Sequence, residues 1–240
     1  MPLEDIIKSR NTGLARADAQ TVLRDSLADS ALAPLALVSS FGAESVVLLH
    51  MIAQIDRATP VIFLDTEMLF PETLAYQRAV AETLGLRDIR VITPDRADIL
   101  AEDVDGILHQ ADTDACCDLR KARPLAKALR PFGGWITGRK QFQNGERAKL
   151  SLFEADGARI KINPLARWSA EDLNAYMARH ALPRHPLVAR GYPSIGCMPC
   201  TTRVAPHENS RAGRWRETAK TECGIHLKSG QRTRPGVTAV

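Results

Sequence analysis

The chain has 240 residues, of which 45% are hydrophobic, enough to bury a full core in one domain that carries a tail. Aromatic residues make up 5% and the formal net charge is +4, which argues against a stacking surface for single-stranded nucleic acid. No long apolar run and no basic N-terminal region before an apolar stretch is present, so we expect neither a membrane partner nor a secretory signal. A cytoplasmic location follows, where clustered cysteines indicate metal binding or catalysis rather than structural disulfides.

Short apolar runs alternate with helical patterns along most of the chain. The predicted strands cover residues 35–38, 61–64, 89–92, 135–138 and 159–162. The predicted helices cover residues 3–30, 46–55, 71–84 and 120–129, and a further one begins at Ser169. This alternation predicts an α/β fold with a doubly wound, mostly parallel sheet. After Pro183 the sequence becomes rich in Pro, Gly, Cys and basic residues, which favours loops that carry a site, and residues 230–240 are predicted to be disordered.

The turn SSFGAES at residues 39–45 follows the first strand and precedes a helix. Unpaired backbone N–H groups at such a helix start bind anions, and the hydroxyls of Ser39, Ser40 and Ser45 add donors. Gly42 allows a ligand to approach the backbone closely. An ordinary helix-capping turn is the competing interpretation, because the pattern is neither GxGxxG nor a Walker A loop. Asp65 and Thr66 at the next strand end are candidates for a ribose or base contact, or for a helix cap.

Four cysteines form two close pairs that lie far apart in the sequence. Cys116 and Cys117 are adjacent, whereas Cys197 and Cys200 form a CxxC motif. Neighbouring side chains diverge, so the adjacent pair suits one zinc ion poorly, while a [4Fe–4S] cube offers separate irons. The spacing therefore favours an iron–sulfur cluster, with zinc, redox disulfides and inert thiols as alternatives.

Two further residues attract attention near these pairs. Lys121 lies one helical turn beyond Cys117, where its charge would offset cluster thiolates, although a surface lysine would look the same. Cys223 stands apart in the segment ECGIHL, with Lys220, His226 and Lys228 nearby. Basic neighbours favour the nucleophilic thiolate, so Cys223 is a candidate nucleophile, the alternative being an incidental surface cysteine.

Taken together, these segments resemble the iron–sulfur type of assimilatory adenylyl-sulfate (APS) reductase, within the phosphoadenylyl-sulfate (PAPS) reductase family. The matching segments are SSFGAES, LDTE, CCDLRK, WITGRK, KINPLARWSAEDL, RGYPSIGCMPCTTRV, RAGRW and ECGIHL. The combination of CC, CxxC and ECGIHL is specific to this group, and the turn also resembles the SGGxDS PP-loop of adenine-nucleotide pyrophosphatases. The resemblance implies a sheet of the PP-loop (adenine nucleotide alpha hydrolase-like) type in residues 1–215, followed by a flexible tail, residues 216–240, that carries the catalytic cysteine.

The resemblance also assigns roles to individual positions. A [4Fe–4S] cluster would be held by Cys116, Cys117, Cys197 and Cys200, and Cys223 would be the catalytic residue. The implied substrate-binding residues are Ser39, Ser40, Gly42, Glu44, Leu64, Lys121, Thr137, Gly138, Arg147, Arg211 and Arg214. Arginine suits this task because its planar guanidinium binds oxyanions through two parallel hydrogen bonds.

The implied activity is the reduction of APS to sulfite and AMP in sulfate assimilation and cysteine biosynthesis. The Cys223 thiolate would attack the sulfate sulfur, AMP would leave, and reduced thioredoxin or a similar dithiol would release sulfite from the S-sulfocysteine. Because thiols supply the electrons, the cluster is expected to act structurally and electrostatically, and family members are often homo-oligomers. The alternatives are the same chemistry on PAPS, a PP-loop tRNA-thiolating enzyme and a zinc-stabilised binding module.

Overall fold

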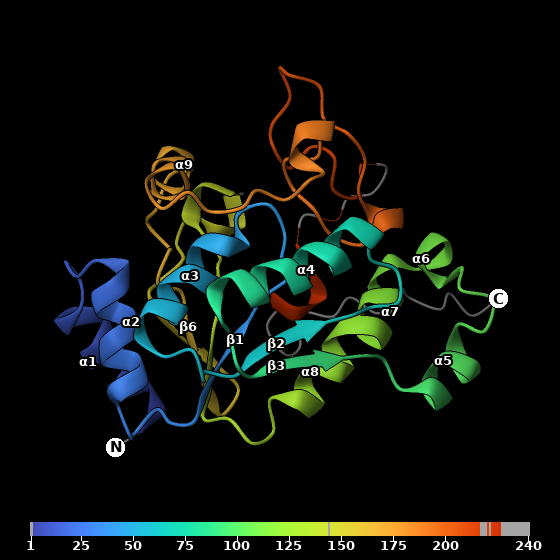
Figure 1. The fold of residues 1–240 in the computed structure, drawn as a ribbon. Helices are drawn as coiled ribbons and strands as arrows, with labels where there is room; N and C mark the ends of the chain where they lie inside the picture. The colour runs from blue at the N-terminus through green and yellow to red at the C-terminus, as the bar shows by residue number, and fades with distance from the viewer. Residues whose placement is uncertain (1, 144, 217–219, 221, 227–240) are drawn as a thin grey trace.

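The computed structural model describes residues 2–143, 145–216, 220 and 222–226 (Figure 1). Its sheet has six strands in the order β3-β2-β1-β4-β6-β5, all parallel except β5, which pairs antiparallel with β6. The predicted mostly parallel, doubly wound sheet is therefore confirmed. The predicted disorder of residues 230–240 lies outside the described residues.

The strands are β1 Leu35–Val38, β2 Val61–Leu64, β3 Ile89–Ile92, β4 Gly134–Ile136, β5 Phe153–Asp156 and β6 Arg159–Ile162. The α-helices are α1 Leu3–Gly13, α2 Ala19–Ala28, α3 Ser45–Ile55, α4 Pro71–Leu84, α5 Arg96–Glu102, α6 Leu108–Ala111, α7 Thr113–Cys117, α8 Arg123–Ala128 and α9 Ala170–Arg179. A π-helical segment, η1 Asp118–Ala122, joins α7 to α8, and five single 3-10 turns occur at η2 Gln141–Gln143, η3 Gly145–Arg147, η4 Val188–Arg190, η5 Met198–Cys200 and η6 Gly224–His226.

Alternate residues of the strands face two separate apolar clusters. In β1, Leu35 and Leu37 belong to the larger cluster with α2, α3, α4 and α9, whereas Ala36 belongs to a smaller cluster. Trp135 and the α8 residue Leu125 lie in this smaller cluster. Successive side chains of a strand point to opposite faces, so a central strand covered on both sides is apolar throughout, as this sequence is.

Three local expectations differ from the structure. The stretch 3–30 forms two helices: α1 ends at Gly13, and α2 begins after Asp18, whose side chain accepts a hydrogen bond from Thr21 N and caps α2. The predicted helix at 120–129 is the end of a longer helical run that begins at Thr113. Strand β5 was not predicted, because its polar sequence FEAD lacks the signature of a buried strand.

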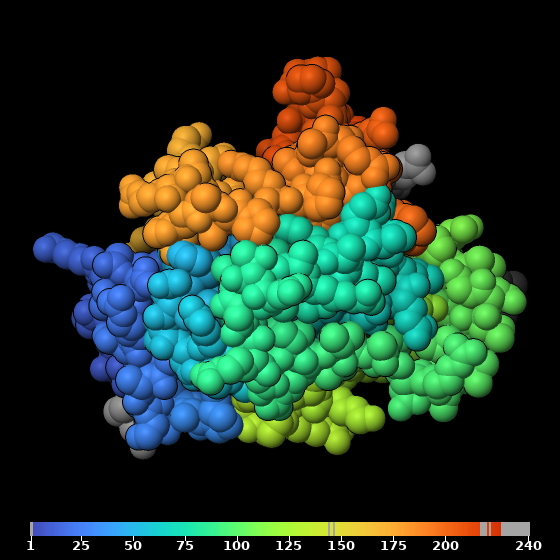
Figure 2. Space-filling model, viewed as in Figure 1, coloured from blue at the N-terminus to red at the C-terminus, as the bar shows by residue number. Residues whose placement is uncertain are grey.

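The residues after Pro183 lie over one end of the sheet. Figure 2 shows residues 184–216, in orange to orange-red, gathered on one side of the molecule beside α3 and α4. The loops therefore cover the end of the sheet at which parallel strands of this fold class place their ligands.

No helix among the described residues is both long enough and apolar enough to span a bilayer.

Candidate functional site

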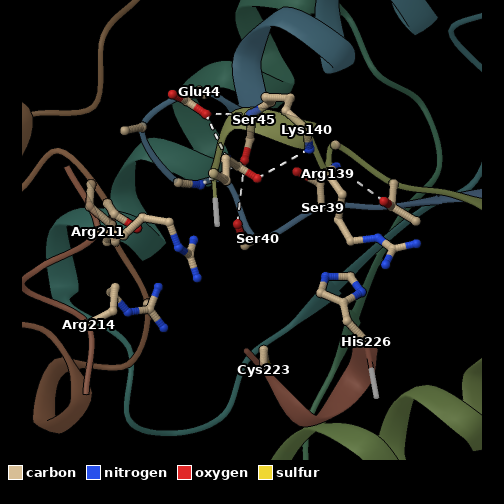
Figure 3. Close-up of a pocket in the computed structure, with 18 of the residues that line it drawn as sticks. Ser39, Ser40, Glu44, Ser45, Arg139, Lys140, Arg211, Arg214, Cys223 and His226 are labelled. Atoms are coloured by element: carbon tan, nitrogen blue, oxygen red, sulfur yellow. Dashed lines mark hydrogen bonds and ion pairs between the residues drawn. The ribbon is translucent and has the colours of Figure 1, made fainter. Parts of the chain in front are cut away.

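A pocket of about 220 Å³ opens at the carboxyl ends of β1, β2 and β4, below the late loops. All the predicted substrate-binding residues and the predicted nucleophile line it: Ser39, Ser40, Gly42, Glu44, Leu64, Lys121, Thr137, Gly138, Arg147, Arg211, Arg214 and Cys223. The turn at residues 39–45 is called the serine turn below. Figure 3 shows Arg211 and Arg214 on one side, extending into the space between the serine turn and Cys223. The structure thus brings together residues from the whole length of the chain, while their individual roles stay predictions.

The turn at residues 39–45 is held in a strained form by its own side chains. Phe41 has a φ of 47°, unusual for a bulky residue, and its ring is fully buried edge-on to Phe63 at 5.3 Å between centroids. The N–H of Phe41 donates to Ser39 Oγ at 3.2 Å, and the N–H of Gly42 donates to Ser45 Oγ at 3.0 Å. Core packing of Phe41 therefore fixes the course of the backbone around the mouth of the pocket.

The acidic residue of this turn is neutralised rather than free. Glu44 forms an ion pair with Lys140 and accepts a hydrogen bond from Gln143 Nε2 at 3.1 Å. Burial lowers the pKa of Lys140, and the Glu44 carboxylate acts in the opposite direction. The turn therefore presents no net negative charge to an incoming anion.

Two of the predicted substrate-binding residues, Thr137 and Gly138, follow the end of β4, and both also contact the body of the protein. Thr137 Oγ1 donates to Asn163 Oδ1 at 3.0 Å and accepts the N–H of Arg139 at 3.2 Å. Gly138 lies in the pocket lining, with Leu48 behind it. By contrast, Asp65 and Thr66 do not reach the pocket: Asp65 accepts the N–H of Glu67, and Thr66 Oγ1 lies 3.2 Å from Cys197 Sγ.

The opposite wall of the pocket is a cluster of arginines. Burial, together with repulsion from Arg147 and Arg214, lowers the pKa of Arg211 to about 10. Arg214 stacks over Trp215 at 4.4 Å from the ring centroid, and its guanidinium lies so close to Gly196 that a Cβ there would displace it. Among the guanidinium groups of the described chain, two buried Nε atoms have no hydrogen-bond partner, those of Arg139 and Arg214. Converging cations with unused donors are what an oxyanion site requires.

The predicted nucleophile lies at the floor of the same pocket. A hydrogen bond from Cys117, the charge of Lys121, the N–H of Ile225 and the charge of Arg214 hold the pKa of Cys223 well below its usual value, against burial. If Cys117 is a metal ligand its hydrogen bond is lost, and Lys121, Arg214 and the backbone N–H remain as causes. The arrangement favours a thiolate beside bound oxyanions, which is the reactive form of cysteine.

The other four cysteines lie behind this floor, on two segments. Cys116 and Cys117 end α7, while Cys197 directly precedes η5 and Cys200 ends it. Cys116, Cys117 and Cys197 are buried, and all five cysteines are free thiols. Burial and the nearby Cys197 and Cys200 raise the pKa of Cys116 to about 11. Burial acts to lower the pKa of Lys121, but Cys197, Cys223 and Cys117 hold it above its usual value.

The donor set at this position fits an iron–sulfur cluster in kind. Across the described residues, no three His, Cys, Asp or Glu side chains converge as ligands of a single metal ion do. The electrostatic coupling of Cys116 to both Cys197 and Cys200 nevertheless places thiols of the two segments close together. Four sulfur donors on two segments, with a lysine to offset their charge, match the needs of a cluster better than those of one zinc ion.

Several pocket residues were missed by the sequence analysis. They are Arg139, Lys140, Gln143, Ile195, Gly196 and Glu222, whereas His226 was considered only as a basic neighbour of Cys223. Three of these positions could have been found from the sequence. Arg139 and Lys140 are a basic pair close to the end of a predicted strand, and Glu222 directly precedes Cys223. Gln143 and Gly196 gave no signal, because their importance comes from their partners Glu44 and Arg214.

The comparisons with known proteins agree with this geometry. Residues 34–203 match the family described as "Phosphoadenosine phosphosulfate reductase domain". The chain is 59% identical to an adenosine 5'-phosphosulfate reductase of Mesorhizobium japonicum, over 80% of this chain and 76% of the relative. It is 39% identical to a phosphoadenosine 5'-phosphosulfate reductase of Gloeobacter violaceus, over 80% of this chain and 82% of the relative.

Solved structures extend the similarity to the fold. A phosphoadenylyl-sulfate reductase of Candida auris in a phosphate complex superimposes with a TM-score of 0.71 and 28% identity, covering 84% of this chain and 98% of the other. A Candida glabrata FMN adenylyltransferase shares the fold alone, with a TM-score of 0.57 and 15% identity over 79% of this chain and 65% of the other. With the family match covering well over half of its length, the chain belongs to the phosphoadenosine phosphosulfate reductase domain family.

Proposed function

We propose that this protein reduces APS to sulfite and AMP, through a sulfonated Cys223 and with a dithiol protein as the reductant. The observation that carries the proposal is the position of Cys223, in one pocket with the Arg211–Arg214 wall and next to Lys121. The relatives named APS reductase in Mesorhizobium japonicum and Chelativorans, at 59% and 52% identity, support this choice of substrate.

In the proposed complex, each half of the substrate occupies one half of the pocket. The adenosine would lie along the strand ends near Leu64, Thr137 and Gly138, and the phosphosulfate would face the arginines. As the sulfur–Sγ bond forms at Cys223, the bond from sulfur to the bridging oxygen breaks, and AMP leaves with that oxygen and the electron pair. Fixed cations stabilise the charge that develops on the leaving phosphate. Alignment of the thiolate with the sulfate sulfur supplies much of the remaining rate acceleration.

The second half-reaction needs two electrons, which a reduced dithiol of the thioredoxin type supplies. One of its thiols attacks Cys223 Sγ, sulfite leaves with the electron pair of the S–S bond, and a mixed disulfide forms. The second thiol of the reductant then releases Cys223 as a thiol and leaves the reductant oxidised. This exchange requires Cys223 to leave the pocket, so residues 216–240 are proposed to form a mobile catalytic tail on a body made of residues 1–215.

A [4Fe–4S] cluster is part of the proposal, with Cys116, Cys117, Cys197 and Cys200 as its ligands. When bound, such a cluster would link α7 to the η5 loop and place negative charge behind Lys121. Lys121 lies between these thiols and the pocket. Its ammonium group attracts the Cys223 thiolate and would also attract the sulfate of the substrate.

A second candidate substrate is PAPS. The relative in Gloeobacter violaceus and the Candida auris structure are both named as reductases of the phosphorylated nucleotide. Turnover of purified protein on APS and on PAPS, at matched concentrations with reduced thioredoxin, distinguishes the two.

The decisive experiment is mass spectrometry of the protein mixed with APS in the absence of reductant. We expect one added SO3 group on the peptide that contains Cys223, together with one equivalent of AMP. Addition of a reduced dithiol should release the group as sulfite. If AMP forms without a modified Cys223, the proposed nucleophile is wrong.

A further inference from the structure

The residue next to the nucleophile makes an unusual contact. Glu222 is 7% exposed, and its carboxylate forms a two-point ion pair with Arg147, from Nε to Oε2 at 2.5 Å and from Nη2 to Oε1 at 2.6 Å. The Arg147 side chain is itself 8% exposed. Glu222 Oε1 also accepts the N–H of Cys223 at 2.9 Å. A buried carboxylate therefore joins the body of the protein directly to the backbone of the nucleophile.

The ion pair continues toward the serine turn. Arg147 Nη1 donates to Gln143 Oε1, and Gln143 Nε2 donates to Glu44 Oε2 at 3.1 Å. Glu44 in turn pairs with Lys140. Polar contacts thus form a continuous chain from Glu44 of the serine turn, through Gln143 and Arg147, to Glu222.

Two further contacts of the same segment lie on the other side of Cys223. Ile225 packs against the apolar cluster that includes Trp135, and the His226 ring stacks on Trp135 with 6.0 Å between centroids and 5° between planes. The N–H of His226 donates to the carbonyl of Cys223 at 2.9 Å. Cys223 is therefore held between an ionic anchor at Glu222 and an apolar anchor at residues 225–226.

The ionic anchor differs from the apolar one in the specificity that it gives. Apolar packing tolerates small shifts, whereas a buried two-point Arg–carboxylate pair has one favourable geometry and is very unfavourable when one partner is missing. The two N–H groups of Arg147 that bind Glu222 are not available to a phosphosulfate while the ion pair is closed. In the docked state, we therefore expect Arg211 and Arg214 to carry the larger share of the anion binding.

We propose that the Arg147–Glu222 ion pair is the latch that docks the catalytic segment and sets the position of Cys223 over the substrate. Glu222 is then a positioning residue, which acts through the Cys223 backbone rather than on the substrate. The latch opens when the segment leaves to meet the reductant, and both charges return to water. The inference rests on the proposed function for its consequence in turnover, but the docking itself requires no substrate.

The test uses the full-length protein and the variant Glu222→Gln, with two readouts. The first is labelling of Cys223 by a bulky polyethylene-glycol maleimide without substrate, at about pH 8.5, where a substantial part of a free thiol is ionised. We expect labelling at least about tenfold faster than in the wild type, because loss of a buried charge partner favours the undocked segment. The second is steady-state turnover, where kcat should fall about 100-fold while KM changes little, since alignment rather than binding is lost.

A double-mutant cycle with Arg147→Gln tests the pairing itself. If the two residues act as one latch, the double variant should label no faster than the faster single variant. Arg147→Lys keeps the charge but loses the two-point geometry, so its labelling rate should be intermediate. The matched control is Glu102→Gln, which breaks an exposed two-point pair with Arg123 and should change neither readout.

The outcomes separate the latch from the reaction. Wild-type labelling rates in Glu222→Gln, or strictly additive effects in the cycle, would overturn the latch. Faster labelling in a protein whose wild type makes no sulfite from APS would support the latch and refute the proposed function. Thermal melting of each variant, expected to match the wild type, shows that the labelling does not come from unfolding of the body.

Discussion

The two halves of the pocket are built by different means. The serine turn is made by a backbone of seven consecutive residues, fixed by the buried Phe41 and by hydroxyls within the turn itself. The arginine wall consists of charged side chains, and one of its members, Arg214, packs against Gly196 and stacks on Trp215. The first half is thus encoded locally, whereas the second depends on contacts between distant segments and on a balance of charge.

The largest expected effect comes from the nucleophile, where the two halves meet. Cys223→Ser should lower sulfite formation by more than about 1,000-fold, because a serine hydroxyl is hardly ionised at neutral pH. AMP binding, which uses the turn half, should be unchanged and serves as the control. Turnover near the wild-type rate would remove Cys223 from the mechanism.

The arginine half is tested by Arg214→Lys. Lysine keeps the charge but loses the planar group that stacks on Trp215 and fits against Gly196. We expect kcat/KM to fall about 100-fold, equivalent to about 2.7 kcal/mol of transition-state stabilisation. The matched substitution Arg190→Lys, in an exposed pair with Glu72, should have little effect. Equal losses in both variants would mean that the wall does not contact the transition state.

The loops should also respond to acid before the sheet does. His185 is 1% exposed and lies between Thr73 Oγ1 at 3.1 Å and the N–H of Leu187, which donates to Nδ1 at 3.2 Å. Burial lowers the pKa of His185 from 6.5 to about 4, against the attraction of Glu72. Because the folded pKa lies below the unfolded one, its contribution is present above pH 6.5 and is lost as the pH falls toward 4.

The loss between pH 7 and pH 5 should be about 2 kcal/mol. To measure this loss, the unfolding free energies of the wild type and of His185→Gln are compared at pH 7 and at pH 5. Groups that titrate in both proteins cancel in the comparison, so the remaining difference belongs to His185. Hydrogen exchange should show the loops after residue 183 opening first. An equal acid response in both proteins would assign the effect to other groups.

The smallest effect is expected in the turn half, where the backbone does most of the binding. A Cβ at Gly42 would lie 3.3 Å from Ser40 Oγ and 3.4 Å from the carbonyl oxygen of Ile195, so Gly42→Ala should displace the turn slightly. We expect KM to rise about tenfold, equivalent to about 1.4 kcal/mol, with little change in kcat. Gly13→Ala, where a Cβ meets nothing within 4 Å, is the control. A fall in kcat with unchanged KM would contradict a role in ground-state binding.

The contrast also explains how much the sequence could predict. The serine turn, the central strands and the cysteine pairs were visible because each depends on residues close together in the chain. The ion pair between Arg147 and Glu222 was not, because nothing near either residue identifies its distant partner. Strand β5 was missed for a similar reason: its pairing with β6, rather than its own polar sequence, makes it a strand.

One consequence of the π-helical segment η1 concerns transfer of the cysteine pair to other scaffolds. The segment Asp118–Ala122 adds one residue per turn between α7 and α8, and Arg120 within it is anchored by Asp103 and by the carbonyl of Thr66. Deleting one residue there would restore a regular helix and rotate Cys116 and Cys117 by about 100° relative to α8. A graft that places CCDLRK in a regular helix would therefore direct the sulfurs differently relative to the helix that follows, so we expect a working graft to need the bulge and its anchor at Asp103.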